Sequence, residues 1–239
     1  MSKKNDKKPI ELYFWPTPNG QKISIALEEL ELPYTIHPVN ITRGDQFKPD
    51  YLAISPNNKM PAIVDPDGPG GDPVSIFESG AILQYLARKA GKLRGKDKRA
   101  RILVDEWLFW QVSGFGPMAG QAHHFRHYAP EKVPYGIDRF TNDVKRLYGV
   151  LDRQLAGRDY IADKFSIADI AAYPWAKGAD RQGQDIETFP HVNAWVARVG
   201  ARPGVMRGMA VGADLPAQQI DLSKDADVQH IVFGNKAKT

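Results

Sequence analysis

Short apolar runs and a helical pattern alternate over the first part of the chain. The aromatic-rich run 10–15 predicts a strand, which stops at Pro16. Apolar residues then recur at the i, i+3, i+4 and i+7 positions of one helix face, at Ile23, Ala26, Leu27 and Leu30. Pro33 ends this pattern, and residues 34–41 resume as a strand. A strand, a helix and a second strand predict a βαβ unit with parallel strands.

Two further apolar runs follow, 62–64 and 74–77, separated by a loop rich in Gly, Pro and Asp. They predict an antiparallel hairpin with an enlarged loop. A helical pattern then opens at Ser79. The order βαβ and then ββα predicts one mixed sheet flanked by helices, an α/β domain over residues 10–90.

The second half of the chain lacks strand alternation. Residues 91–98 are basic and Gly-containing, which is typical of a linker, and residues 99–209 carry helical periodicity. We therefore expect an α/β domain followed by an all-α domain, a bundle of helices. We expect helices at 137–155, 167–175 and 192–199, and an earlier helix from about 102 that is interrupted at Gly114, Gly116 and Pro117.

Local signals mark the start of one helix and the two ends of the chain. Ser166-x-x-Asp169 ahead of an apolar run resembles a capping box and predicts a helix start. Residues 1–9 form a basic tail. Residues 210–239 turn rich in Gly, Asp and Lys, so we expect a loosely packed extension there.

Composition excludes several kinds of chemistry. The chain has no cysteine, so it has no disulfide, no thiolate metal site and no thiol nucleophile of its own. Its net charge of +4 comes mainly from basic clusters without interleaved aromatic residues, which argues against nucleic-acid binding. No signal peptide and no bilayer-spanning apolar run are apparent, so we expect a cytoplasmic protein without a membrane partner.

The segment between the first strand and the first helix is the first candidate site. Backbone N–H groups at a helix start are unpaired and carry partial positive charge, which stabilises an anion. Thr17 and Asn19 add a hydroxyl and an amide donor there, a setting that favours a bound thiolate. Taken alone, this segment is explained more simply by a plain turn in which Thr17 or Asn19 caps the helix.

Two other segments extend the candidate site. In Lys59-Met60-Pro61, a cis proline would leave the Met60 backbone free to pair with an extended peptide. Glu78 and Ser79 open the later helix, where they suit the ammonium and the carboxylate of an amino-acid head group. Lys59 suits a second carboxylate. Together these partners match the tripeptide γ-Glu-Cys-Gly, glutathione.

The order of these motifs resembles the glutathione-binding domain of glutathione transferases. It comprises Thr-Pro-Asn at 17–19, Lys-Met-Pro-Ala-Ile-Val at 59–64 and Ile-Phe-Glu-Ser-Gly-Ala-Ile at 76–82. The finer pattern is similar to the bacterial nu class, the glutathione-dependent disulfide-bond reductases. It includes the segments 44–47 (GDQF), 54–59 (ISPNNK), 107–112 (WLFWQV), 116–118 (GPM) and 123–125 (HHF).

The resemblance implies a thioredoxin-like first domain and a set of ligand contacts. Thr17 and Asn19 would hold the sulfur, Met60 would pair through its backbone, and Glu78 with Ser79 would hold the γ-glutamyl head. Gln46 and Lys59 would bind the glycine end. Arg139 of the helical domain would reach glutathione across a homodimer. The nu class reduces small disulfides with two bound glutathiones and without an enzyme cysteine.

Some residues have rival interpretations. Tyr13 could activate a thiol, as a tyrosine near this strand does in other transferase classes, although inward packing explains it more simply. His123 and His127 share a helix face, but we expect a loop-like region there and no metal site, since no acidic or thiol partner completes a ligand set. We expect Tyr13, His123, Phe125 and Trp175 to contribute to the wall of the second-substrate site.

The sequence thus predicts a homodimeric enzyme that reduces small disulfides by thiol–disulfide exchange through bound glutathione. One alternative is a glutathione S-transferase that conjugates glutathione to electrophiles. Another is a non-catalytic interaction protein that keeps the transferase fold. Glutathione, reduced or oxidised, is the expected co-substrate in either enzyme.

Overall fold

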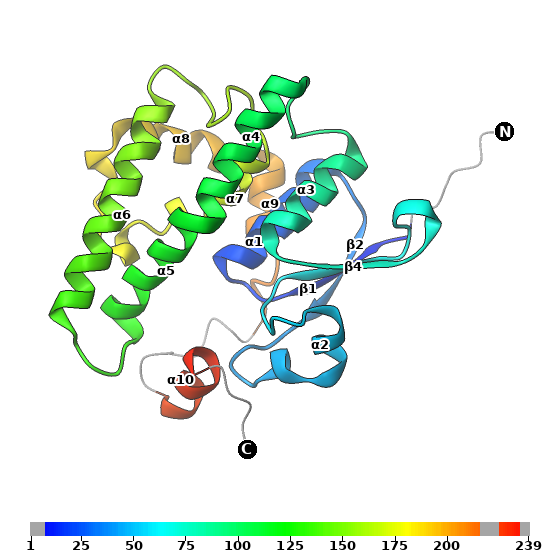
Figure 1. Ribbon diagram of the computed structural model, residues 1–239, viewed down its shortest axis with the longest axis horizontal. Coiled ribbons are helices and arrows are strands. Elements are labelled where there is room, and N and C mark those ends of the chain that lie inside the picture. Colours follow the sequence, from blue (N-terminus) through cyan, green and yellow to red (C-terminus); the bar gives the residue numbers. More distant parts are fainter. Residues whose placement is uncertain (1–7, 216–224, 235–239) are drawn as a thin grey trace.

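The computed structural model describes residues 8–215 and 225–234, and it places a small mixed sheet beside a set of helices (Figure 1). The strands are β1 (Ile10–Phe14), β2 (Tyr34–Pro38), β3 (Ala62–Asp65) and β4 (Val74–Phe77), in the order β2-β1-β3-β4. β1 pairs with β2 in parallel, whereas β3 runs antiparallel to both β1 and β4. The predicted βαβ unit and hairpin are confirmed.

The two faces of this sheet bury different partners. Ile10, Leu12 and Phe14 alternate inward on β1 and are at most 2% exposed, within the main core that includes α1 (Pro18–Leu30) and α3 (Ser79–Ala90). The opposite face carries a smaller cluster around Tyr51 of α2 (Pro49–Ile54). The first domain is therefore a sheet covered on both faces, and the thioredoxin-like expectation is confirmed.

The second domain is helical, as predicted. Its helices are α4 (Lys98–Trp110), α5 (Gly116–His123), α6 (Pro134–Leu155), α7 (Ile167–Ala176), α8 (Pro190–Gly200) and α9 (Pro203–Ala210). Among the described residues, none of the helices is long and apolar enough to cross a membrane.

The expected break after α4 and the loop-like region before Pro130 are wrong. Two π-helical turns, Gln111–Phe115 and His124–Tyr128, keep the backbone helical from α4 through α5 to Tyr128. Each π turn admits one extra residue without ending the helix. Pro117 lies in the first turn of α5, directly after the first π turn, and its lack of an N–H does not end the helix there.

Polar contacts fix α7 and α1 at the boundary between the domains. The capping box predicted at Ser166 and Asp169 is present, and the Trp195 indole donates to the Asp169 carboxylate at 2.9 Å. Helix α1 packs against α3 of its own domain and against α7 and α9 of the other. Its Ser24 hydroxyl donates to the Gly208 carbonyl at 2.7 Å. Helix α1 is therefore held from both domains.

The described part of the C-terminal extension is ordered against the rest of the protein. It forms α10 (Ala226–Phe233), in which Val228 and Ile231 are 8% and 4% exposed. The Phe233 ring lies 4.7 Å from the His124 ring. The expectation of loose packing is wrong for this helix, because its apolar face covers the end of the π turn at 124–128. Residues 216–224 and 235–239 of the extension and residues 1–7 of the basic tail lie outside the described residues.

Candidate functional site

The start of α1 is built around Thr17 and Gly20. Thr17 is the N-cap residue, and its hydroxyl oxygen accepts from the Gly20 N–H at 3.3 Å. A Cβ on Gly20 would lie 2.2 Å from the Trp15 carbonyl oxygen, so only glycine lets the helix begin this close to the end of β1. The capping interpretation is therefore correct, and it does not exclude the anion site, because a cap satisfies only part of the first helical turn.

Asn19 is oriented by the second domain. The Trp175 indole N–H on α7 donates to Asn19 Oδ1 at 3.2 Å. This bond uses the acceptor end of the amide, so the donor end, Nδ2, is the part of the side chain left for a ligand. Trp175 thus reaches the candidate site by holding Asn19, a contact that sequence spacing does not reveal.

The segment before β3 lies directly beside the start of α1. The Met60–Pro61 peptide bond is cis, as the sequence suggested. The Thr17 hydroxyl lies 3.7 Å from the Met60 sulfur, so these two predicted site residues are in contact. The Lys59 carbonyl accepts from the hydroxyls of Tyr51 and Ser55, both at 2.8 Å. These bonds fix the backbone just before the cis peptide.

The groups assigned to the glycine end differ in exposure. Gln46 is 5% exposed, and its amide nitrogen donates to the Ile41 carbonyl at 3.3 Å. Its Oε1 has no hydrogen-bond partner among the described residues. Lys59 is exposed at its side chain, and desolvation lowers the pKa of its ammonium. Gln46 is therefore a buried amide and Lys59 an exposed cation, the two kinds of group assigned to the glycine carboxylate.

The groups assigned to the γ-glutamyl head lie at the start of α3. Glu78 has a left-handed φ of 69° and is exposed, and it accepts from the Asn57 amide at 3.4 Å. Such a φ is uncommon outside glycine and is typical of constrained sites. The hydroxyl of Ser79 accepts from Lys22 Nζ at 3.3 Å.

Lys22 is a functional candidate that the sequence interpretation missed. It is 1% exposed, and Gln111 Oε1 accepts from its Nζ at 2.7 Å. Burial lowers the pKa of Lys22 to about 7, and the nearby Glu78 charge opposes this. One signal was available: Lys22 follows Asn19 by three residues and precedes Ala26 by four, which places it on the buried helix face.

Tyr13 packs its ring against His37 and Tyr51. It lies on the face of β1 with the smaller cluster and stacks on His37 at 4.9 Å. Burial and the charges of Glu11 and Asp50 raise the pKa of the Tyr13 hydroxyl, which keeps this hydroxyl protonated. The structure favours the packing interpretation. Its assignment to the second-substrate wall stays a prediction.

The other predicted wall and helical-domain residues lie around α5 and α6. Burial lowers the pKa of His123 to about 4, and its ring packs 4.7 Å from Tyr128. Phe125 stacks on Phe140 of α6 at 5.2 Å, and Arg139 is exposed on α6. Among the described residues, no group of three or more His, Cys, Asp and Glu side chains could hold a metal ion.

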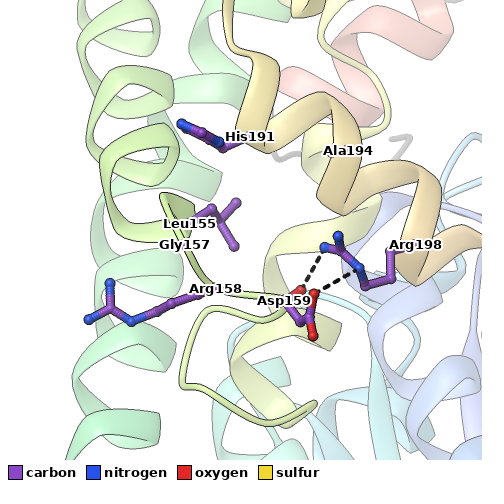
Figure 2. A pocket seen from close by; sticks show the side chains of 7 residues that line it. All are labelled: Leu155, Gly157, Arg158, Asp159, His191, Ala194 and Arg198. Carbon is purple, nitrogen blue, oxygen red and sulfur yellow. Dashed lines mark hydrogen bonds and ion pairs between the residues drawn. The ribbon is translucent and has the colours of Figure 1, made fainter.

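A separate surface pocket of about 310 Å³ lies between the end of α6 and α8 (Figure 2). Its cations are already neutralised: Arg198 faces Asp159 at 3.4 Å, and Arg158 binds Asp163 at 3.0 Å. The Asp152 carboxylate accepts from the first N–H groups of α8 at 2.9 and 3.1 Å. The pocket therefore offers no free charge to an anion, and none of the predicted site residues lines it.

Comparison with known protein families gives two matches. The family model described as "Glutathione S-transferase, N-terminal domain" matches residues 17–89. The model described as "Glutathione S-transferase, C-terminal domain" matches residues 130–203. The first match contains the α1 start, the cis-proline segment and the α3 start, and the second contains α7 with Trp175.

Individual relatives agree with these matches. The chain is 50% identical over 196 residues to the disulfide-bond oxidoreductase YfcG of Escherichia coli K12, covering 81% of this chain and 91% of that protein. A glutathione transferase from Burkholderia graminis, with two glutathione molecules per subunit, superposes with a TM-score of 0.81 at 43% identity. That alignment covers 85% of this chain and 88% of the other.

A third relative carries the oxidised ligand. A glutathione transferase from Pseudomonas putida, solved with one glutathione disulfide per subunit, has a TM-score of 0.81 and 43% identity. The alignment covers 87% of this chain and 93% of the other.

Proposed function

Because the chain belongs to the glutathione S-transferase family, we propose that it reduces small disulfides with glutathione, in the manner of the nu class. One observation carries the proposal. A chain without cysteine presents the Thr17 cap, the Asn19 amide donor and the cis Met60–Pro61 segment side by side at a helix start. The thiol that such a site stabilises must come from a ligand.

The reaction follows from thiol–disulfide exchange. The thiol of glutathione bound at the start of α1 loses its proton. The resulting thiolate attacks one sulfur of the substrate disulfide, and the other sulfur leaves as the first substrate thiolate. A second glutathione attacks the mixed disulfide and releases the second substrate thiolate with oxidised glutathione. Two thiols are oxidised to one disulfide, and one disulfide is reduced to two thiols, so the electrons balance. The relatives with two glutathiones or one glutathione disulfide per subunit support this stoichiometry.

Each predicted contact has a place in this scheme. Thr17 and Asn19 stabilise the sulfur, and the Met60 backbone pairs with the cysteinyl residue. Glu78 and Ser79 bind the γ-glutamyl head, and the glycine carboxylate lies near Lys59 and Gln46. We assign His123, Phe125, Trp175 and Tyr13 to the surroundings of the disulfide substrate.

We also propose that the enzyme is a homodimer. Ile102 and Phe109 are 61% and 60% exposed and lie two turns apart on one face of α4. Such a face is better buried against a second subunit. Arg139, exposed on α6, would then reach the glutathione of the partner subunit. The reaction needs a compartment in which glutathione is kept reduced, so we propose that the protein acts in the cytoplasm.

Steady-state turnover of 2-hydroxyethyl disulfide with glutathione tests the function. We expect glutathione-dependent formation of oxidised glutathione, one molecule per disulfide consumed. A high conjugation rate with chlorodinitrobenzene and negligible disulfide turnover would instead identify a conjugating transferase. Retention on glutathione-agarose without either activity would favour an interaction protein.

A further inference from the structure

Lys22 lies buried beneath the start of α3 and joins three elements. Its Nζ is 3.3 Å from Ser79 Oγ on α3 and 2.7 Å from Gln111 Oε1 in the π turn after α4. The side chain is 1% exposed, whereas lysines are almost never fully buried unless their ammonium is paired. Neither partner here is an acid. The position therefore requires an explanation beyond an ordinary ion pair.

The direction of these hydrogen bonds constrains Ser79. In its charged form Lys22 has donors only, and Ser79 Oγ then accepts from it. The proton of the Ser79 hydroxyl is then available to another acceptor. Ser79 is half-buried at the first position of α3, where the free N–H groups also face outward along the helix axis. All donors at this point favour one kind of ligand group, an anion.

Gln111 keeps Lys22 in this position. Gln111 is fully buried, and its Oε1 accepts from the ammonium at 2.7 Å. Its Nε2 has no partner among the described residues. The Gln111 amide therefore accepts from Lys22 through its oxygen while its nitrogen makes no hydrogen bond among the described residues. An arrangement selected for packing alone gains nothing from this.

We propose that Lys22 is a positioning residue for the γ-glutamyl α-carboxylate of glutathione, acting through the Ser79 hydroxyl and through its own charge. The inference rests on the proposed function, because it takes glutathione as the ligand. Lys22 does not touch the reacting sulfur. It aligns Ser79 as a donor and adds a positive charge behind the helix start, and both effects stabilise a carboxylate at Ser79.

The pKa of Lys22 agrees with this role. Burial lowers the pKa of Lys22 to about 7, so the charge is held at a cost when no anion is present. The Glu78 carboxylate is the charged neighbour that partly offsets this cost. A ligand carboxylate placed over Ser79 adds a second negative charge nearby. Binding at Ser79 and the charge of Lys22 therefore support each other.

The test separates the ligand carboxylate from the rest of the tripeptide. Isothermal calorimetry compares glutathione with 4-aminobutyryl-cysteinylglycine, which keeps the amine, thiol and glycine end but lacks the α-carboxylate. We expect Lys22→Met to weaken glutathione binding by about tenfold or more, the value of one hydrogen bond to a charged group. The same substitution should change binding of the analogue by less than about twofold on this reasoning.

Two further variants distinguish positioning from packing. Ser24→Ala removes a buried bond between α1 and α9 without touching Ser79, so it should affect both ligands equally. Gln111→Glu replaces the amide that accepts from Lys22 with a carboxylate at the same position. If Lys22 only tied the domains together, this variant would bind glutathione as well as the wild type. Our proposal predicts weaker binding of glutathione and unchanged binding of the analogue.

The outcomes are distinguishable. If wild-type protein fails to bind glutathione at all, the proposed function fails and the role of Lys22 fails with it. If the wild type binds glutathione but Lys22→Met weakens both ligands by the same factor, only the role of Lys22 is overturned. Should Lys22→Met not fold, equal effects of Gln111→Glu on the two ligands would contradict the proposal.

Discussion

Replacing Asn19 by alanine should raise the pKa of the bound glutathione thiol by about one to two units. The Asn19 amide has its oxygen occupied by the Trp175 indole at 3.2 Å, so its nitrogen is oriented to donate. The Thr17 hydroxyl lies 3.7 Å from the Met60 sulfur and also caps α1. We therefore expect Asn19 to donate the stronger hydrogen bond to the thiolate. Thr17→Ala should raise the pKa of the bound thiol by less than Asn19→Ala does.

The magnitude follows from the loss of one hydrogen bond to an anion. Such a bond contributes about 1.5–3 kcal/mol. A shift of one pKa unit corresponds to about 1.4 kcal/mol between the two protonation states. Removing the bond destabilises the thiolate and leaves the thiol nearly unaffected, so the whole difference appears in the pKa. At a pH below the pKa of the bound thiol, each unit of this rise lowers the thiolate fraction about tenfold, and the exchange rate falls by less because the more basic thiolate is the better nucleophile.

A pH titration that follows the ultraviolet absorbance of the thiolate, with the protein at a concentration that saturates glutathione binding, measures this pKa directly. Asn19→Ala also leaves the Trp175 N–H without its partner, so Trp175→Phe is the matched control. That variant frees Asn19 but keeps its amide, and it should raise the pKa less. An unchanged pKa in Asn19→Ala, or a larger shift in Thr17→Ala, would refute the assignment of Asn19.

Four further predictions concern stability and the partner subunit. Burial lowers the pKa of Lys22 from 10.5 to about 7, so between pH 7 and 10 the unfolded chain binds more protons than the folded protein. The free energy of unfolding of the wild type, measured in urea, should therefore rise over this range relative to Lys22→Met, by up to about 1.4 kcal/mol per pH unit. The same pH profile in both proteins would contradict the burial of Lys22. Ser166→Ala removes the capping box of α7 and should cost about 1 kcal/mol in thermal unfolding, with glutathione affinity kept; a loss above about 3 kcal/mol would mean a larger role. Ile231→Ala should accelerate hydrogen exchange in α10, since it removes a side chain only 4% exposed, and unchanged exchange would refute this packing. Arg139→Ala should weaken glutathione binding by about tenfold in the dimer, and equal affinity in calorimetry would remove Arg139 from the site.

The sequence predicts those features whose signals are local. The strands and the hairpin follow from apolar runs bounded by Pro, Gly and Asp, and the α7 start follows from the Ser166–Asp169 spacing. The cis bond before Pro61 is suggested by the Met60-Pro61 dipeptide and its position just before a predicted strand. In each case the residues that determine the structure are adjacent in the chain, so no knowledge of tertiary neighbours is needed.

The features that sequence reasoning missed depend on distant neighbours. Gly114, Gly116 and Pro117 indicate a helix break, yet the π turn before α5 accommodates them, and Phe115 is fully buried within it. The helix spacing places Lys22 on the buried face of α1, but its partner Gln111 lies 89 residues away, and no local signal reveals that contact. The Trp175–Asn19 bond likewise joins residues 156 positions apart. Such contacts arise from the packing of the two domains.

A crystal structure with glutathione bound tests the central claim most directly. Our account predicts the glutathione sulfur within hydrogen-bond distance of Asn19 at the start of α1, with the γ-glutamyl carboxylate on Ser79. A sulfur positioned away from Asn19, or a site that remains empty at saturating glutathione, would contradict it.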